Sequence, residues 1–124
     1  MIFIGVDNVE ISRFNDKLLH NKRFLNFCFT KVEQHYCFEK INPSQHFAVR
    51  YAAKEAVNKA ISALNKTLVY SAIEIQNAES GRPLVILHTN DEELLKMKVE
   101  ISLSHSASEA IAFAVVYSEG LNYS

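Results

Sequence analysis

The stretch that decides the fold is Ser44–Asn65, SQHFAVRYAAKEAVNKAISALN. It is rich in alanine and contains neither glycine nor proline, and both features favour a helix because alanine has the highest helix propensity. Its larger apolar residues recur at helical spacing near one face, namely at Phe47, Tyr51, Val57, Ile61 and Leu64. The sequence therefore predicts one long amphipathic helix whose apolar face is buried against other elements.

The residues on the N-terminal side of this helix predict one strand and two shorter helices. Met1–Val6 is an apolar, isoleucine-rich run ended by Asp7–Asn8, which indicates a buried strand leading into a polar turn. Apolar residues recur at loose helical spacing over Val9–Leu19. Thr30–Glu33 has the form of a capping box that opens a helix to about residue 38.

The residues on the C-terminal side predict a β-hairpin, a short helix and two more strands. The hairpin turns at Ser80–Pro83, where glycine and proline supply turn chemistry. The expected elements are strands at Leu68–Gln76 and Leu84–His88, a helix at Asn90–Lys98, and strands at Val99–Leu103 and Ala110–Tyr117. We therefore expect a single α+β domain over residues 1–118, with the long central helix packed on a mainly antiparallel sheet, and a loose tail at residues 119–124.

The composition limits the classes of function. The chain has 124 residues, and 13 lysines and arginines against 14 aspartates and glutamates exclude a globally basic nucleic-acid binder. It contains two cysteines, too few for a disulfide framework, and no apolar run long enough to span a membrane. Because Met1 leads directly into the expected strand, we expect a cytoplasmic protein with no membrane and no nucleic-acid partner. A domain of this size has little surface left to enclose a large ligand, which would need a partner subunit.

Carboxylates and a lysine form the first candidate site. Asp7 has Glu10 three residues on, and such carboxylates either coordinate a hard cation such as Mg²⁺ or cap the following helix. Glu55 and Lys59 stand four residues apart on the long helix, where they form a surface ion pair or supply a metal ligand and a phosphate-binding ammonium. Spacing alone leaves both pairs of alternatives open.

Two further polar segments are candidates for binding. Ser102–Ser106, SLSHS, offers hydroxyls and an imidazole to phosphate or nucleotide oxygens, and the alternative is a hydroxyl-rich β-turn. Between Arg13 and Lys31, basic residues outnumber acidic ones by five to one. Arg13, Lys17 and His20 fall at i, i+4 and i+7 on the expected helix, which forms either a docking face for an acidic partner or an ordinary solvated face.

Taken together, four segments resemble the holo-acyl-carrier-protein synthases, which are the short bacterial-type 4′-phosphopantetheinyl transferases. They occur in the family's order and at its spacing between Met1 and about Val116, and their joint occurrence is far more specific than any one of them. The segments are Gly5–Glu10, Arg50–Ala56 with Lys59, Gly81–Pro83, and Ser102–His105.

The resemblance implies transfer of the 4′-phosphopantetheine group of coenzyme A to a serine of apo acyl carrier protein, in support of fatty acid biosynthesis, with release of adenosine 3′,5′-bisphosphate. It implies Asp7 and Glu55 as ligands of Mg²⁺, for which Mn²⁺ is a substitute, and Glu55 and Lys59 as catalytic residues. Lys59 would face the diphosphate and assist departure of the leaving group. Either a carboxylate such as Glu55 or a water on the metal would take the serine proton, and the sequence does not choose between them.

The resemblance also implies the surfaces that bind each substrate. Coenzyme A would contact Arg50, Lys59, Gly81, Arg82, Pro83, Ser104 and His105. The acidic carrier protein would dock on Arg13, Lys17, His20 and Arg23. The family's members are homotrimers, so the resemblance further implies active sites between subunits, with Asp7 and Glu55 on one subunit and parts of the coenzyme A wall on its neighbour.

One segment departs clearly from the family's pattern. After the long helix the family usually has a Gly-Thr-Gly loop, whereas this chain has Ile61–Thr67, ISALNKT, without glycine. A glycine loop lets the backbone approach phosphate closely, and without it the helix can run longer. The departure keeps open an alternative function, a catalytically silent module of the same fold that binds coenzyme A or a carrier protein.

Overall fold

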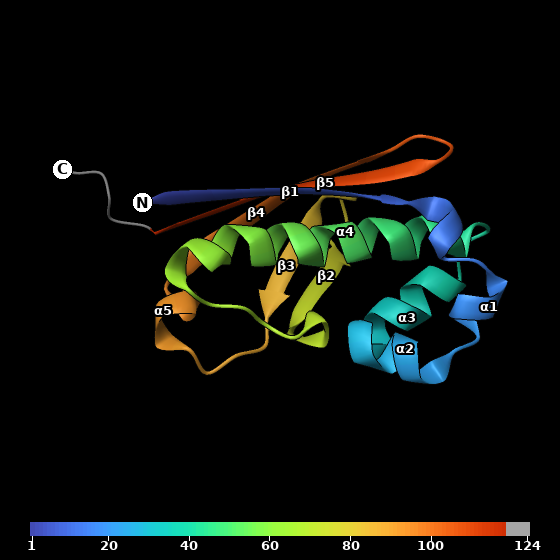
Figure 1. The fold of residues 1–124 in the computed structure, drawn as a ribbon, viewed down its shortest axis with the longest axis horizontal. Coiled ribbons are helices and arrows are strands. Elements are labelled where there is room, and N and C mark those ends of the chain that lie inside the picture. Colours follow the sequence, from blue (N-terminus) through green and yellow to red (C-terminus); the bar gives the residue numbers. More distant parts are fainter. Residues whose placement is uncertain (119–124) are drawn as a thin grey trace.

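The long helix predicted from the sequence is the central element of the structure, a computed structural model that describes residues 1–118. Helix α4 spans Pro43–Ile61, and Pro43 suits its first turn because a backbone N–H there has no partner within the helix. Figure 1 shows α4 lying along one face of a sheet, with the other helices and a hairpin on its opposite side. The predicted α+β domain with a long helix on a sheet is confirmed.

The strands pair antiparallel, as predicted, but they form two sheets rather than the single sheet expected. The larger one has three strands in the order β1 (Ile2–Glu10), β5 (Glu109–Ser118) and β4 (Met97–His105). A hairpin joins β2 (Ile73–Asn77) to β3 (Pro83–Leu87) through a turn in which the glycine at position 81 has a φ of 91°. Because that left-handed conformation favours glycine, the glycine fixes the turn that the sequence predicted.

Small residues let α4 approach the larger sheet closely. The alanines that are almost fully buried at this contact are Ala52, Ala56 and Ala60 of α4 and Ala110, Ala112 and Ala114 of β5. At Gly5 of β1, an added Cβ would stand 2.0 Å from the backbone oxygen of Ala56, so no larger residue fits without a shift. The backbone of β1 therefore crosses α4 directly.

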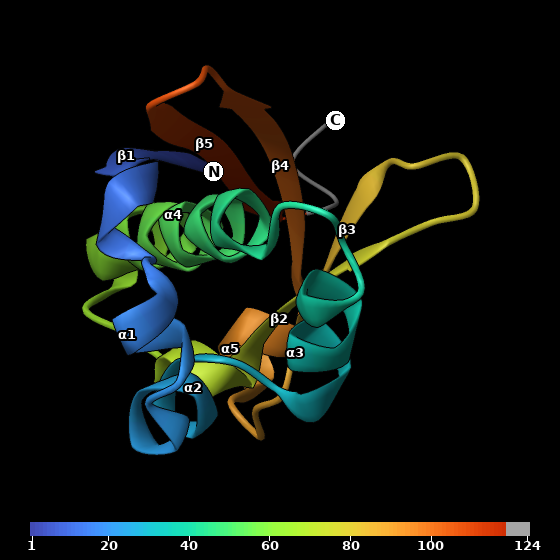
Figure 2. The same ribbon diagram turned by 90° about the vertical axis from the view of Figure 1, so that its right-hand side faces the viewer.

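The other side of α4 is covered by short helices and the hairpin. These helices are α1 (Asp16–Leu19), α2 (Lys22–Cys28) and α3 (Lys31–Phe38), which Figure 2 shows grouped on the side of α4 away from the larger sheet. The capping box predicted for α3 is confirmed. The hydroxyl of Thr30 accepts from the Glu33 amide at 3.2 Å, and the Glu33 carboxylate accepts from the Thr30 amide at 2.9 Å.

A buried ion pair links these layers. Lys54 and Glu33 both have fully buried side chains, and Nζ of Lys54 lies 2.8 Å from Oε1 of Glu33. Nζ also donates to the backbone oxygens of Tyr70 and Ile73. The other carboxylate oxygen of Glu33 accepts from the amide of Ile75 at 2.8 Å. Burial lowers the pKa of Lys54, and the pair joins α3, α4 and β2 inside the core.

The first strand is longer than predicted. It continues to Glu10 because its pairing with β5 runs through Asp7 and Asn8, with Asp7 opposite Ala112. The polar turn expected at Asp7–Asn8 is therefore wrong. The side-chain amide of Asn8 instead donates to Oε1 of Glu109 at 2.8 Å, across the sheet.

The helix expected over Val9–Leu19 is also wrong. This segment forms a 3-10 turn, η1 (Ile11–Arg13), followed by the four-residue helix α1. The side chain of Asn15 accepts a hydrogen bond from the first turn of α1 and so caps a new helix in the middle of the predicted one. Arg13 and Lys17 consequently do not lie on one helix.

The chain after α4 turns without glycine. A 3-10 turn, η2 (Ser62–Leu64), follows Ile61, and Asn65 then adopts a φ of 59°. Asparagine tolerates this left-handed conformation better than most residues. Asn65 thus supplies the change of direction after α4.

The remaining boundaries differ by a few residues from those predicted. Strand β2 is preceded by a 3-10 turn, η3 (Tyr70–Ala72), where the sequence predicted strand. Helix α5 (Glu92–Leu95) is shorter than predicted and is capped by the side chain of Asp91. Strand β4 begins at Met97 and runs through His105, whereas the sequence predicted a strand at Val99–Leu103.

The face of the larger sheet turned away from α4 is apolar and exposed. Its large apolar side chains are 42–68% exposed, and they are Ile2, Ile4, Val6, Ile111 and Phe113. This face has no covering layer within residues 1–118 (Figure 1).

Three expectations about the whole chain can be compared with the structure. Over residues 1–118, no helix has the length and apolar character needed to cross a membrane. The two cysteines, Cys28 and Cys37, are buried and unpaired, and burial raises the pKa of their thiols to about 11 and about 12. The loose tail predicted at residues 119–124 lies outside the described residues.

Candidate active site

Asp7 and Lys59 meet where β1 crosses α4. The Nζ atom of Lys59 lies 2.9 Å from Oδ1 of Asp7 and 3.0 Å from the backbone oxygen of Val6. Their side chains are 19% and 54% exposed, so the pair borders solvent. Glu10, considered as a helix cap, makes no side-chain cap on η1. Asp7 is therefore the partner of Lys59 rather than a helix cap.

Glu55 lies one helical turn before Lys59 on α4. Its Oε1 atom accepts a hydrogen bond from the hydroxyl of Tyr70 at 2.5 Å. This hydrogen bond, together with burial, raises the pKa of Tyr70 well above its usual value, so the hydroxyl stays protonated and donates. In the described part of the chain Lys59 pairs with Asp7, so the surface ion pair that was one alternative for Glu55 and Lys59 is not formed.

The two carboxylates are suited to a hard divalent cation. Within residues 1–118, no three histidine, cysteine, aspartate or glutamate side chains gather into a complete set of metal ligands. Mg²⁺ does not require such a set, because it is commonly held by one or two carboxylates together with substrate phosphates and water. Asp7 and Glu55 supply oxygen donors of this type, and Lys59 adds a positive charge for a phosphate.

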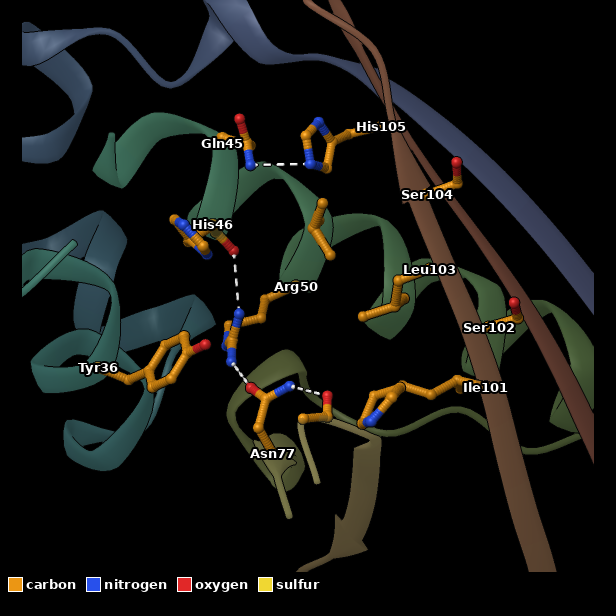
Figure 3. Close-up of a pocket in the computed structure, with 13 residues that line it drawn as sticks. Tyr36, Gln45, His46, Arg50, Asn77, Ile101, Ser102, Leu103, Ser104 and His105 are labelled. Atoms are coloured by element: carbon orange, nitrogen blue, oxygen red, sulfur yellow. Dashed lines mark hydrogen bonds between the residues drawn. The ribbon is translucent and has the colours of Figure 1, made fainter. Parts of the chain in front are cut away.

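A cavity of about 450 Å³ lies between α4, β4 and the β2–β3 hairpin. Five of the residues that the resemblance assigned to coenzyme A line it, and they are Arg50, Gly81, Pro83, Ser104 and His105. Figure 3 shows the side chain of Arg50 extending from α4 between α3 and the hairpin. The fold thus brings together segments that are separated by more than fifty residues in the sequence.

Arg50 is the buried charge of this cavity, with 3% of the residue exposed. One guanidinium nitrogen donates to Oδ1 of Asn77 at 2.6 Å, and another to the backbone oxygen of His46 at 3.5 Å (Figure 3). The guanidinium carbon lies 4.2 Å from the ring centre of Tyr36. Across residues 1–118, Nε has no hydrogen-bond partner and no carboxylate pairs with the guanidinium. A buried cation without a counter-charge indicates an anionic ligand.

Two histidines border the same cavity. Nε2 of His105 lies 2.9 Å from the side-chain amide of Gln45 (Figure 3). Burial and the neighbouring charge of Arg50 lower the pKa of His46, which favours its neutral form. The cavity therefore combines the Arg50 cation with the neutral imidazole of His46 and the side-chain amide of Gln45.

Strand alternation separates two of the expected contacts. Both residues line the cavity, but the ring of His105 faces it, whereas the hydroxyl of Ser104 projects from the other side of β4 (Figure 3). Since these residues lie in a strand, the alternative of a hydroxyl-rich turn is wrong for them. Arg82 is 65% exposed and pairs with Glu100 at 2.8 Å, so the structure does not direct it into the cavity.

The cavity and the carboxylates lie on different sides of α4. Lys59 is nine positions after Arg50, and at about 100° per residue the two side chains leave the helix about 180° apart. Glu55, five positions after Arg50, is displaced by about 140°. One chain therefore holds two separate halves of the site that the resemblance implies.

The basic residues expected to bind a carrier protein are exposed but lie on separate short segments. Arg13 ends η1, Lys17 lies in α1, His20 follows α1, and Arg23 lies in α2. The guanidinium of Arg13 stands 5.6 Å from the ring centre of Tyr51. The single helical face expected from the i, i+4, i+7 spacing is wrong, because Asn15 interrupts the helix.

Sequence reasoning missed several residues of both halves. Tyr36, His46 and Asn77 surround Arg50, and Tyr70 holds Glu55. None of them belongs to a local motif, because each reaches its partner through a tertiary contact. The one local signal of such partners was Arg50, a charged residue in an alanine-rich helix.

Comparisons with known proteins identify the family of this chain. A family model described as the 4′-phosphopantetheinyl transferase superfamily matches residues 3–115. The chain is 38% identical to the holo-[acyl-carrier-protein] synthase of Clostridium perfringens, covering 96% of both chains. It is 41% identical to that of Chlamydia caviae, covering 90% of this chain and 93% of the relative.

Solved structures show the same fold. A Chronobacterium ammoniagenes ACPS-CoA complex matches with a TM-score of 0.82 at 24% identity, covering 97% of this chain and 99% of the other. A holo-(acyl-carrier-protein) synthase from Bacillus anthracis in complex with CoA (3′,5′-ADP) matches with a TM-score of 0.76 at 29% identity, covering 94% and 96%. The chain therefore belongs to the 4′-phosphopantetheinyl transferase superfamily and, within it, to the holo-acyl-carrier-protein synthases.

Proposed function

We propose that this protein transfers the 4′-phosphopantetheine group of coenzyme A to a serine of apo acyl carrier protein and releases adenosine 3′,5′-bisphosphate. Its relatives are named for making holo acyl carrier protein, and the Bacillus anthracis relative is described in complex with CoA (3′,5′-ADP). The observation that carries the proposal is the meeting of Asp7 with Lys59 beside Glu55, where β1 crosses α4. A silent binding module is not favoured, because it has no need of this acidic and basic cluster.

Each residue of the cluster has a distinct role in the reaction. Asp7 and Glu55 would hold Mg²⁺, or Mn²⁺ in its place, and the bound cation would offset the negative charge of the diphosphate. Lys59 donates to a carboxylate and a backbone oxygen, so its ammonium stays at the same place while it exchanges one acceptor for a diphosphate oxygen. There it stabilises the charge that develops on the leaving adenosine bisphosphate.

Mass spectrometry of the carrier protein tests the activity. After incubation with this protein, coenzyme A and Mg²⁺, apo acyl carrier protein should gain the mass of one phosphopantetheine group. Glu55→Gln should abolish the gain without lowering the unfolding temperature, whereas the control Glu92→Gln, an exposed carboxylate of α5, should retain it. A carrier that gains no mass with the unaltered protein would overturn the proposal.

We further propose a homotrimer whose active sites lie between subunits. Arg50 and Lys59 leave α4 in opposite directions, so a ligand that contacts both within one chain would have to pass around the helix. A second copy can instead present its Arg50 cavity to the Asp7 and Lys59 cluster of the first. The exposed apolar face of the larger sheet, which includes Ile4 and Phe113, offers the surface for such an assembly.

Mixing two impaired variants tests the shared site. Arg50→Met and Lys59→Ala should each have little activity alone, because each damages one half of every site. Subunit exchange between them should restore about a quarter of the activity, since one in four subunit pairings then has both halves intact. Sedimentation measurements should give a trimer. Trimers that exchange subunits but stay inactive would show that each chain carries a whole site.

We also propose that Arg13, Lys17, His20 and Arg23 form the docking face for the acidic carrier protein. All four are exposed, and Arg13 lies on the Glu55 side of the molecule, because its guanidinium stands over Tyr51, whose ring packs on that of Tyr70. Arg13→Glu should raise the KM for the carrier at least about tenfold and leave the KM for coenzyme A unchanged. An equal effect on both would remove this face from docking.

A cytoplasmic location remains a prediction, based on the unpaired cysteines.

A further inference from the structure

The hydroxyl of Tyr70 contacts Glu55, but Tyr70 has no role in the proposed reaction itself. Tyr70 stands in η3, on the segment that links α4 to β2, and donates to Oε1 of Glu55 at 2.5 Å. Over residues 1–118 this is the only hydrogen bond that the Glu55 carboxylate makes with the protein. Tyr70 therefore determines how the carboxylate is turned.

The ring of Tyr70 is fixed by two other aromatic residues. Tyr51 of α4 packs against it with ring centres 5.4 Å apart, and Phe27 of α2 meets it edge-on at 6.1 Å. These two contacts limit the rotation of the ring. The hydroxyl consequently stands in one place relative to α4.

The backbone around Tyr70 is tied to α4 as well. The buried ammonium of Lys54 donates to the backbone oxygen of Tyr70 at 2.9 Å. Two residues earlier, the side-chain amide of Asn58 binds both the amide and the oxygen of Leu68 at 2.9 Å. Lys54 and Asn58 flank Glu55 in the sequence of α4, so the helix that carries the carboxylate also holds the residue that orients it.

We propose that Tyr70 is a positioning residue that presents the Glu55 carboxylate to the divalent cation. It occupies Oε1 and leaves Oε2 for the metal, and its rigid attachment stops the carboxylate from rotating. Partners that orient a metal ligand in this way commonly contribute 10- to 100-fold to metal affinity. The proposal rests on the function proposed above, in which Glu55 is a metal ligand.

Binding of Mn²⁺ to the intact protein in the presence of coenzyme A tests the proposal, because the signal of free Mn²⁺ is measured directly by electron paramagnetic resonance. Tyr70→Phe keeps the ring and removes only the hydroxyl, and it should weaken Mn²⁺ binding about tenfold. The Mg²⁺ concentration that half-saturates transfer should rise by a similar factor. Mn²⁺ binding that is unchanged in Tyr70→Phe would overturn the proposal.

Two further variants separate positioning from general stability and from the function itself. Phe27→Leu loosens the packing of the same ring but keeps the hydroxyl. It should therefore lower the unfolding temperature and weaken Mn²⁺ binding less than Tyr70→Phe does. In a Glu55→Gln background, Tyr70→Phe should have no further effect on Mn²⁺ binding, and an additive effect would contradict the proposal. If Glu55→Gln itself leaves Mn²⁺ binding intact, the assignment of Glu55 as a ligand fails instead.

Discussion

Helix α4 carries two lysine–carboxylate pairs that use the same chemistry for different purposes. Lys54 pairs with Glu33 at 2.8 Å, and both side chains are fully buried. Lys59 pairs with Asp7 at 2.9 Å, and its side chain is 54% exposed. Five positions on one helix thus separate a pair inside the core from a pair open to solvent.

The difference shows that the surroundings, rather than the residue types, decide the role of each pair. The remaining N–H groups of Lys54 donate to the backbone oxygens of Tyr70 and Ile73, so none is left for a ligand. Within residues 1–118 Lys59 has only one backbone partner, Val6, and water can reach it. A buried pair of this kind holds elements together, whereas an exposed one can exchange a partner for substrate.

The largest effect is expected from breaking the buried pair. Lys54→Ala leaves the Glu33 carboxylate without a counter-charge in the core and should lower the free energy of unfolding by about 3–5 kcal/mol. Urea denaturation measures it. The double variant Glu33→Gln with Lys54→Met removes both charges and should be more stable than Lys54→Ala alone; if it is not, the uncompensated charge is not the cause.

The exposed pair should respond in the opposite way. Lys59→Ala should lower kcat by about 10²-fold, because it removes the cation that stabilises the leaving group, while the free energy of unfolding changes by less than about 1 kcal/mol. Steady-state transfer rates and urea denaturation are measured on the same samples. A large loss of stability with an unchanged kcat would make this pair structural, like the first.

A change at Gly5 should disturb the exposed pair without altering either member. The Cβ of Gly5→Ala would stand 2.0 Å from the backbone oxygen of Ala56, so β1 must move away from α4, at a cost of about 1–3 kcal/mol. Asp7 lies two residues further along β1 and moves with it. Thermal unfolding and Mn²⁺ binding should both weaken, and Mn²⁺ binding that stays unchanged would separate Asp7 from the metal.

A third pair, between Lys66 and Asp91, should have the smallest effect. Its Nζ and Oδ2 atoms are 2.5 Å apart, and this hydrogen bond is the main cause that lowers the pKa of Asp91. A carboxyl whose pKa is lower in the folded state stabilises the fold above its unfolded pKa and loses that contribution as the pH falls through the folded value. Lys66→Ala should therefore lower the unfolding temperature by no more than a few degrees at neutral pH, with the difference disappearing in acid.

Local patterns predicted those parts of the fold whose signals are complete within a few residues. The alanine-rich helix, the capping box at Thr30 and the glycine turn of the hairpin are all confirmed. Patterns failed where a tertiary partner competes with them. Strand pairing with β5 carried β1 through Asp7, and the side chain of Asn15 divided the helix expected around it.

The candidate site divides along the same line. The sequence by itself determined the residue types and the family, because Asp7, Glu55, Lys59 and Arg50 stand in motifs of fixed spacing. Only the tertiary structure decided that Lys54 is buried, that Tyr70 holds Glu55, and that Arg50 and Lys59 face opposite ways. Burial and contact between distant segments depend on how whole elements pack. The spacing of residues within one segment does not predict that packing.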